Sequence, residues 1–235
     1  MAYVLHSRTH CGWIRTTAAI ALLAVLAAGA LCPAARADEH GPTLAPERDF
    51  RHFSDFAWLA LGATSGFVGH ELGHIVTDLM TLHHPTFHTT KTGPLYFFAI
   101  QPCCGALSHA EEYAIASAGL VVNNLSSELI LSISPRIRSR HAPFMKGVLL
   151  VDFGLELGYA ISGFVQSAHP KGFPDQSDVA SMSRALGVSP WRVSLSVMAP
   201  ALIDLYRYFV PRSSFVPWVG IQSKVFMAGL VLPLL

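Results

Sequence analysis

Apolar stretches long enough to cross a lipid bilayer recur along this chain of 235 residues, and they limit what it can fold into. Each approaches the roughly 20 residues that a helical membrane span requires. Charged residues make up only 13% of the sequence, whereas an ordinary soluble domain contains about 25%. The sequence therefore predicts an all-α, multi-pass bundle of transmembrane helices rather than a soluble enzyme or a disordered protein, with spans over residues 56–82, 113–133, 144–168, 191–210 and 216–235.

Residues 95–107 form a further apolar stretch, which is shorter than an ordinary span and is interrupted by Pro102 and Gly105. Three forms fit it: a re-entrant loop, a membrane-buried hairpin, or a short broken helix that would add a sixth span. The prediction is therefore a bundle of about five to six spans.

The segments between the stretches are polar and short. Three arginines cluster in residues 135–141, which places that connection in the cytoplasm by the positive-inside rule. The longest connection, residues 169–190, contains a predicted helix with Ser177 as its N-cap and Gly187 near its end.

The first 37 residues have the features of a secretory signal peptide: a basic start, a short apolar run and small residues up to Ala37. We expect cleavage after Ala37, and an uncleaved first anchor is the alternative. Residues 38–53 would then be an exposed leader. Residues 54–235 would form a membrane-embedded domain, in an inner membrane of bacterial type.

Ionisable side chains interrupt several of the apolar stretches. Such groups cost several kcal/mol in a bilayer core, so each is a functional candidate by default. Asp204 is the exception among these side chains. It lies near Arg207 at the end of its stretch, so we expect it to belong to a satisfied polar network rather than to a functional site. The remaining candidates are Glu71, Asp78, Glu128, Asp152 and Glu156, with Asn123 and Asn124 as uncharged neighbours.

Residues 70–74 read His-Glu-Leu-Gly-His. On a helix, His70 and His74 lie on one face and can hold one metal ion, with the carboxylate of Glu71 beside it. Zn²⁺ with three protein ligands keeps one position for water and lowers the pKa of that water to about 7. Glu71 would take the proton and return it to a leaving amine. The alternative is a buried pair of histidines that are hydrogen-bonded within the bundle.

The same stretch has glycines at positions 62, 66, 69 and 73, a spacing that lets another backbone approach closely. We expect these glycines to form a packing face. Asp78 follows His74 by four residues on the ligand face, where it either orients a histidine or simply ends the helix.

The string Gly-His-Glu-Leu-Gly-His inside an apolar stretch resembles the site-2 protease family of intramembrane zinc metalloproteases. A second motif of that family, Ala-Gly-Pro-x-x-Asn, is matched here by Ala118, Gly119 and Asn123, with Leu120 in place of the proline. The resemblance implies that Asn123 helps to bind substrate or to polarise the peptide carbonyl, and Asn124 is its neighbouring competitor.

A third motif of the family is an aspartate at the start of a helix, usually followed by glycine, that completes the metal site. Asp178, here followed by Val179, resembles it. The resemblance therefore implies Asp178 as the third zinc ligand. The alternatives that stay open for this ligand are Asp175, Asp152, Glu156 and Asp78.

The resemblance implies a zinc endopeptidase that cleaves membrane-embedded or membrane-proximal segments of other proteins. A non-catalytic membrane scaffold, chaperone or transporter that has kept a metal site is the alternative. Asp152 and Glu156, four residues apart, would suit an ion or proton path in such a protein. Glu71 argues against it, because a merely structural metal site does not require that residue.

Other functional classes find less support. The formal net charge is +1, so nothing favours nucleic acid as a partner. No Cys-x-x-Cys pair is present, which disfavours a cysteine zinc site. A carboxylate-type di-iron bundle needs two Glu-x-x-His pairs, and only that of Glu71 and His74 is present.

Overall fold

The computed structural model of the protein describes residues 52–92, 95–103, 106–169 and 177–211, together with Gly220 and Lys224. This part of the chain is mostly helical. The predicted signal peptide, nearly all of the predicted leader and most of the last apolar stretch lie outside the described residues, and those assignments stay predictions.

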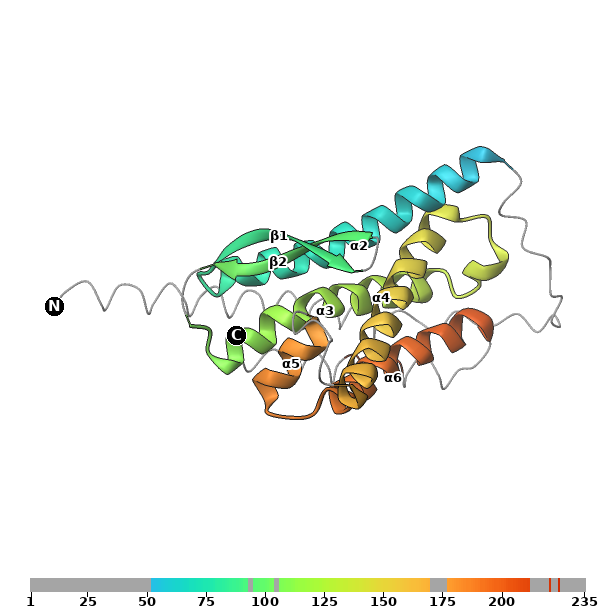
Figure 1. Cartoon of the computed structure of the whole chain (residues 1–235). Coiled ribbons are helices and arrows are strands. Elements are labelled where there is room, and N and C mark those ends of the chain that lie inside the picture. Colours follow the sequence, from blue (N-terminus) through green and yellow to red (C-terminus); the bar gives the residue numbers. More distant parts are fainter. Residues whose placement is uncertain are drawn as a thin grey trace, which may run out of the picture.

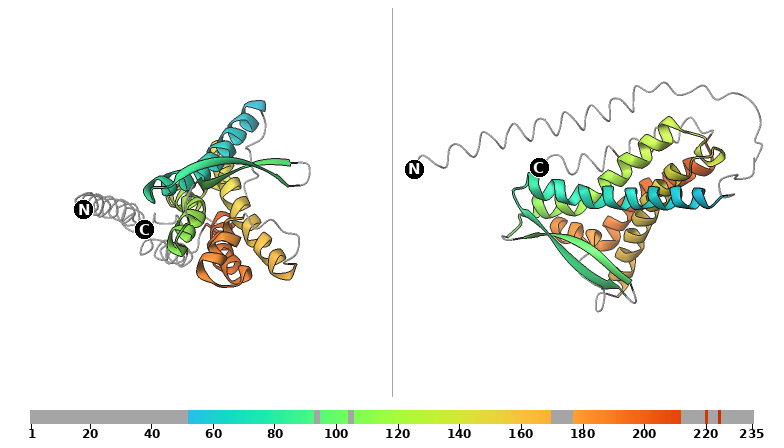
Figure 2. Two further views of the ribbon diagram at one scale, coloured as in Figure 1. Left: turned by 60° about the vertical axis from the view of Figure 1, so that its left-hand side comes forward. Right: turned by 90° about the horizontal axis from the view of Figure 1, so that it is seen from above.

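The described chain forms five α-helices and one β-hairpin (Figure 1). The elements are α2 (Phe53–Met80), β1 (His84–Thr92), β2 (Leu95–Cys103), α3 (His109–Ile133), a short 3-10 turn (Ile137–Ser139), α4 (Pro143–Ala168), α5 (Asp178–Leu186) and α6 (Pro190–Phe209). Helices α3 and α4 lie at the centre, because each of them contacts α2, α5 and α6. The hairpin packs against α2 (Figures 1 and 2).

Helix ends follow the capping residues in the sequence. The hydroxyl of Ser177 accepts a hydrogen bond from the amide of Ala180 at the start of α5, and Gly187 ends this helix with a φ of 63°. The predicted helix in the longest connection is therefore confirmed. Helix α3 begins with a capping box, in which Ser108 and Glu111 each bind the other's backbone amide.

Four of the five predicted spans are helices, and the fifth lies mostly outside the described residues. Among the described helices, α3 and α4 are long and apolar enough to cross a membrane. Helix α2 carries two histidines and two acidic residues within its apolar stretch, at positions 70, 71, 74 and 78. The arrangement of five or more spans stays a prediction.

The β-hairpin corrects the prediction of an all-α fold. Leu95–Cys103 is a strand and pairs antiparallel with His84–Thr92, so a helical sixth span over residues 95–107 is wrong. The first segment is rich in threonine and the second in aromatic residues, and both residue types favour strands. The sequence between them, Gly93-Pro94, is of a kind that favours turns. High apolarity alone favours burial in a membrane, whereas the residue types of this segment favour a strand.

Glycines bring the backbone of α2 against its neighbours. A Cβ atom on Gly62 would lie 2.0 Å from the carbonyl oxygen of Phe144 in α4, and one on Gly73 would lie 2.8 Å from that of Ala118 in α3. Gly66 also lies close to α4, whereas Gly69 has only ordinary contacts. The predicted packing face is therefore confirmed, and it contacts two different helices.

Replacing Gly147 of α4 with alanine is expected to destabilise the fold. Its Cβ would lie 2.1 Å from the carbonyl oxygen of Leu59, so α2 and α4 would have to separate, at a cost of about 1–3 kcal/mol. Gly154→Ala on the same helix is the matched control, because a Cβ there meets no described atom within 4 Å. Alanine should even stabilise that position, by up to about 1 kcal/mol. Unfolding in detergent micelles measures both, and equal stabilities would contradict the expected clash.

Candidate metal centre

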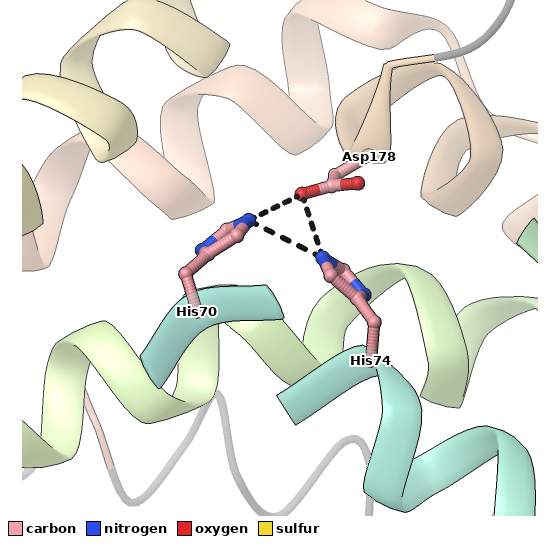
Figure 3. A group of neighbouring side chains, drawn as sticks. All are labelled: His70, His74 and Asp178. Carbon is pink, nitrogen blue, oxygen red and sulfur yellow. Dashed lines mark hydrogen bonds and ion pairs between the residues drawn. The ribbon is translucent and has the colours of Figure 1, made fainter. Parts of the chain in front are cut away.

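Two histidine side chains of α2 face each other in the interior of the bundle (Figure 3). His70 and His74 lie one helical turn apart, and their exposed fractions are 0% and 5%. Their Nε2 atoms are 3.2 Å apart. The i, i+4 spacing has therefore placed two imidazole nitrogens at one point, as the sequence predicts.

Asp178, the first residue of α5, brings a carboxylate to the same point (Figure 3). Its Oδ2 atom lies 3.3 Å from Nε2 of His70 and 3.5 Å from Nε2 of His74. Helix α5 is fixed there because Val179 and Met182 are fully buried in an apolar cluster with residues of α3 and α6. The ligand that the resemblance implies is thus adjacent to the histidine pair.

The distances fit a small tetrahedral cation. Ligand bonds of about 2.0–2.1 Å and tetrahedral angles separate two ligand atoms by about 3.3–3.4 Å. The three facing atoms are separated by 3.2, 3.3 and 3.5 Å. Two imidazoles and one carboxylate suit zinc, although other divalent transition metals bind such donors as well. Among the described residues, these three form the group that could hold a metal ion.

Hydrogen bonding prepares His74 to act as a ligand. Its Nδ1 atom lies 2.7 Å from the carbonyl oxygen of Ile115 in α3. A carbonyl only accepts hydrogen bonds, so Nδ1 carries the proton and donates it. In the neutral ring the lone pair of Nε2 then points at His70 and Asp178, an arrangement typical of metal-binding histidines.

The charge of Asp178 makes the point where the three side chains meet attractive to a cation. Burial would raise the pKa of Asp178, but the imidazoles of His74 and His70 hold this pKa below its ordinary value. The carboxylate is therefore ionised at neutral pH. Its Oδ2 atom has no hydrogen-bond partner in the described part of the chain, so it remains available to a cation.

Gly119 of α3 leaves the space in front of the histidine nitrogens open. A Cβ atom at this position would lie 2.6 Å from Nε2 of both His70 and His74. Any side chain at position 119 would thus fill the space that a shared cation needs. The sequence resemblance includes Gly119, but only the structure supplies this steric reason.

Gly119→Ala is therefore expected to remove most of the bound metal, as elemental analysis of the purified protein would measure. The helix itself should tolerate alanine, which has a higher helix propensity than glycine. Gly158→Ala is the control, because a Cβ there has no neighbour within 4 Å among the described atoms. Full metal content in Gly119→Ala would show that the ion binds elsewhere.

Glu71 lies beside the metal-binding group rather than in it. Its side chain is half-buried, and it is close enough to interact electrostatically with His70, His74 and Asp178. A carboxylate at this position can exchange a proton with a molecule bound next to the three ligands. This is the place that the sequence motif predicts for a general base.

Asn123 and Asn124 are both buried in α3, but they differ in hydrogen bonding. Asn124 donates from its side-chain amide to the carbonyl of Leu120. Both polar side-chain atoms of Asn123 lack a hydrogen-bond partner within the described residues, and Asn123 follows Gly119 by one helical turn. Asn123 is therefore the better placed of the two to bind a ligand.

The alternative third ligands lie outside the metal-binding group. Asp78 and Glu156 are fully buried, with carboxylate oxygens that have no partner among the described residues. Asp152 hydrogen-bonds with Ser126. Asp175 lies outside the described part of the chain. Nor does Asp78 orient His74, whose Nδ1 is held by the carbonyl of Ile115 instead.

Asp204 belongs to a separate, fully paired network, as predicted. It accepts a hydrogen bond from Ser127 at 2.7 Å and one from Arg207 at 3.2 Å, and it pairs with Lys224. Glu128 joins the network through Arg207, at 2.7 Å. The two acidic and two basic side chains of this network, which come from α3, α6 and Lys224, compensate one another.

Sequence reasoning missed Tyr159 of α4, whose ring stacks on that of His70 with a centroid distance of 5.7 Å and an interplanar angle of 14°. Its spacing of three residues from Glu156 is the signal that could have placed it on the buried polar face of its helix.

Comparisons of the chain with protein family models, curated proteins and solved structures gave no match.

Proposed function

We propose that the protein is a zinc-dependent endopeptidase that hydrolyses peptide bonds within or next to a membrane. The observation that carries this proposal is the convergence of His70, His74 and Asp178 at the spacing of a tetrahedral cation, with Glu71 adjacent. A purely structural site would require the three ligands but not a carboxylate placed beside them.

His70, His74 and Asp178 would hold Zn²⁺, which supplies a Lewis acid that polarises a carbonyl and makes water more acidic. Glu71 accepts the proton of the attacking water while the new C–O bond forms. It then delivers that proton to the nitrogen of the leaving amine as the C–N bond breaks. The amide of Asn123 is proposed to hydrogen-bond the peptide of the substrate, since both its polar atoms are buried without a described partner.

The distribution of side chains on α2 supports a position in the membrane. Its buried face carries His70, His74 and Asp78. Its exposed face is apolar, with side chains that are about half exposed: Leu61, Val68, Leu72, Val76 and Leu79. A helix at the surface of a water-soluble protein buries its apolar residues and exposes its polar ones. In lipid, a helix instead keeps its polar residues inside the bundle.

Two other long helices, α4 and α6, also bury charged residues and expose apolar ones. Asp204 and Arg207 are buried on α6, and Asp152 and Glu156 on α4. Their exposed faces are again apolar, with Leu150 and Ile161 on α4 and Leu195, Leu202 and Phe209 on α6. We therefore infer a multi-pass arrangement in which α2, α3, α4 and α6 all contact lipid.

The substrate class follows from this location. The site lies between helices whose outer surfaces are apolar, so a substrate reaches it from the bilayer or from its surface. Segments of other membrane proteins, or peptides close to the membrane, meet this requirement.

The proposal is tested with purified protein in detergent. We expect about one zinc ion per chain by elemental analysis. Incubation with a panel of transmembrane peptides should yield cleavage products by mass spectrometry, and removal of zinc by a chelator should stop cleavage until zinc is restored. A native protein that binds no metal even when zinc is supplied would overturn the proposal.

A further inference from the structure

Two acidic side chains of α4 lie buried in the bundle without a basic partner in the described part of the chain. The exposed fractions of Asp152 and Glu156 are 1% and 0%. One oxygen of Asp152 hydrogen-bonds with Ser126 of α3. Its other oxygen and both oxygens of Glu156 have no hydrogen-bond partner among the described residues. A carboxylate that is enclosed away from water is strongly destabilising unless a cation lies against it.

The buried basic side chains of the neighbouring network already have acidic partners. Arg207 pairs with Glu128 at 2.7 Å and with Asp204 at 3.2 Å. Lys224 pairs with Glu128 at 2.9 Å and also with Asp204. Two acids and two bases balance within this network, so it leaves no positive charge over for the two carboxyl groups of α4.

The position of Glu156 on α4 places it next to the metal centre. Glu156 is one helical turn from Asp152 and one turn from Tyr159, so these three side chains share one face of the helix. On this face Asp152 contacts α3 through Ser126. The ring of Tyr159 stacks on that of His70, with 5.7 Å between the ring centroids. Glu156 therefore lies between a contact with α3 and a contact with the metal-binding group.

Asn123 occupies the corresponding place on α3. It is one turn from Ser126, which contacts α4, and one turn from Gly119, where a Cβ would lie 2.6 Å from Nε2 of His70. The two helices are thus connected on both sides of this level. Asn123 is 1% exposed, and neither polar atom of its side chain has a described partner. An uncompensated amide and two carboxyl groups are therefore buried between α3 and α4, within about one helical turn, or about 5 Å, of the histidines.

The two carboxyl groups suit an ammonium or a guanidinium group. Together they present three oxygens without a described partner, one from Asp152 and two from Glu156. Ca²⁺ takes about six to eight oxygen ligands, which is more than this. An ammonium or guanidinium group instead offers several N–H donors to carboxylate oxygens. Lysine and arginine carry these groups at the ends of long apolar stems, and Asn123 is proposed above to bind the peptide of the substrate.

We propose that Asp152 and Glu156 bind a basic side chain of the peptide substrate, so that the enzyme prefers segments with lysine or arginine close to the scissile bond. This inference rests on the proposed function and deepens it. An extended peptide advances about 3.3 Å per residue, so the basic residue lies within about two positions of the scissile bond. Glu156 is no more enclosed than His70, and the parting of helices that brings a peptide to His70 brings the side chain to Glu156.

Pairs of peptides that differ by one charge test this preference on the full-length protein with zinc. Each pair carries lysine or norleucine at one position near the cleavage site, and norleucine has a stem of similar length without the ammonium group. The lysine peptide should be cleaved with about 10–100-fold higher kcat/KM at the preferred position, since hydrogen bonds to charged groups contribute about this factor. Glutamate at the same position should give the poorest substrate.

Two conservative variants connect the preference to the carboxyl groups. Glu156→Gln and Asp152→Asn each remove one charge at nearly constant size, so the ratio of the two kcat/KM values should fall towards one. A general effect on folding would slow both peptides equally and leave this ratio unchanged. Both variants should keep their zinc. Glu112→Gln is the matched control, because Glu112 pairs with Arg184 at the start of α3 and should leave the ratio as it is.

The outcomes separate this inference from the proposed function. If the zinc-loaded wild type cleaves none of the peptides, both are overturned. Cleavage of lysine and norleucine peptides at equal rates at every position would overturn this inference alone, and so would an undiminished preference in both variants. If the variants do not fold, a peptide with a photoreactive group beside its basic side chain decides with the wild type. Cross-links should map to residues 152–156 of α4, and cross-links confined to other segments would overturn the assignment.

Discussion

Glu71→Gln is expected to lower the rate of peptide hydrolysis by about 10²–10⁴-fold, the usual contribution of a general base. Glutamine has nearly the same size and shape as glutamate, but its amide does not accept a proton from water at neutral pH. Glu71 lies outside the group formed by His70, His74 and Asp178. The variant should therefore keep its zinc while losing turnover, and elemental analysis together with a cleavage assay would measure both.

Glu112→Gln is the matched control for this prediction. Glu112 lies in the first turn of α3 and pairs at the surface with Arg184, at 3.2 Å. Loss of an exposed pair of this kind costs at most about 1 kcal/mol and should leave the cleavage rate unchanged.

The same variant separates the peptidase from the non-catalytic alternative. The buried charges of α4 and α6, which hydrolysis does not use, are the observation that favours a scaffold or transporter. Such a protein would not depend on Glu71. Unchanged turnover in Glu71→Gln would exclude this residue as the base. If neither the wild type nor this variant hydrolyses peptides, the result would favour the non-catalytic scaffold or transporter.

The sequence predicts the relation between the two histidines because that relation depends on local spacing. His70, Glu71 and His74 lie within five consecutive residues of one helix, so helical geometry alone fixes their relation. Asp178 is more than one hundred residues away, and it was placed by resemblance rather than by geometry. Only the packing of α5 against α3 places its carboxylate beside the two histidines.

Tertiary contacts explain what the sequence could not provide. The carbonyl of Ile115 in α3 contacts His74 in α2. Every residue has a backbone carbonyl, so the sequence contains no signal for this contact. Tyr159 resembles any interfacial tyrosine until α4 is placed against α2. The strand over residues 95–103 was not predicted for a different reason: apolar strands and apolar membrane segments have a similar apolar content and differ mainly in which apolar residue types they contain.

Average hydropathy also underestimates how apolar the outer face of α2 is. Helix α2 carries its polar residues at positions that face the bundle, so its average hydropathy falls although its outer face is apolar. Only the separation of the two faces in three dimensions reveals this. The polar residues on the buried face of α2 thus lower the average hydropathy by which membrane spans are usually recognised.

Loss of metal is the expected result of His74→Ala and of Asp178→Ala. The decrease in metal affinity should exceed the roughly 10–100-fold decrease that follows removal of a group that only orients a ligand. Each substitution deletes one of the three atoms that face one another at 3.2–3.5 Å. His141→Ala is the control, since His141 pairs with Asp55 and its side chain is 58% exposed. Elemental analysis after dialysis against a weak chelator would measure the metal per chain.

The two ligand variants test different parts of the site. Zinc lost from both, and retained in His141→Ala, is the result expected from the geometry of the centre. Zinc lost only from His74→Ala would mean that another carboxylate completes the site. Asp78, Asp152 and Glu156 would then be tested in turn, together with Asp175. Full retention in His74→Ala would contradict the metal centre altogether, because the remaining ligand nitrogen and carboxylate do not enclose an ion on their own.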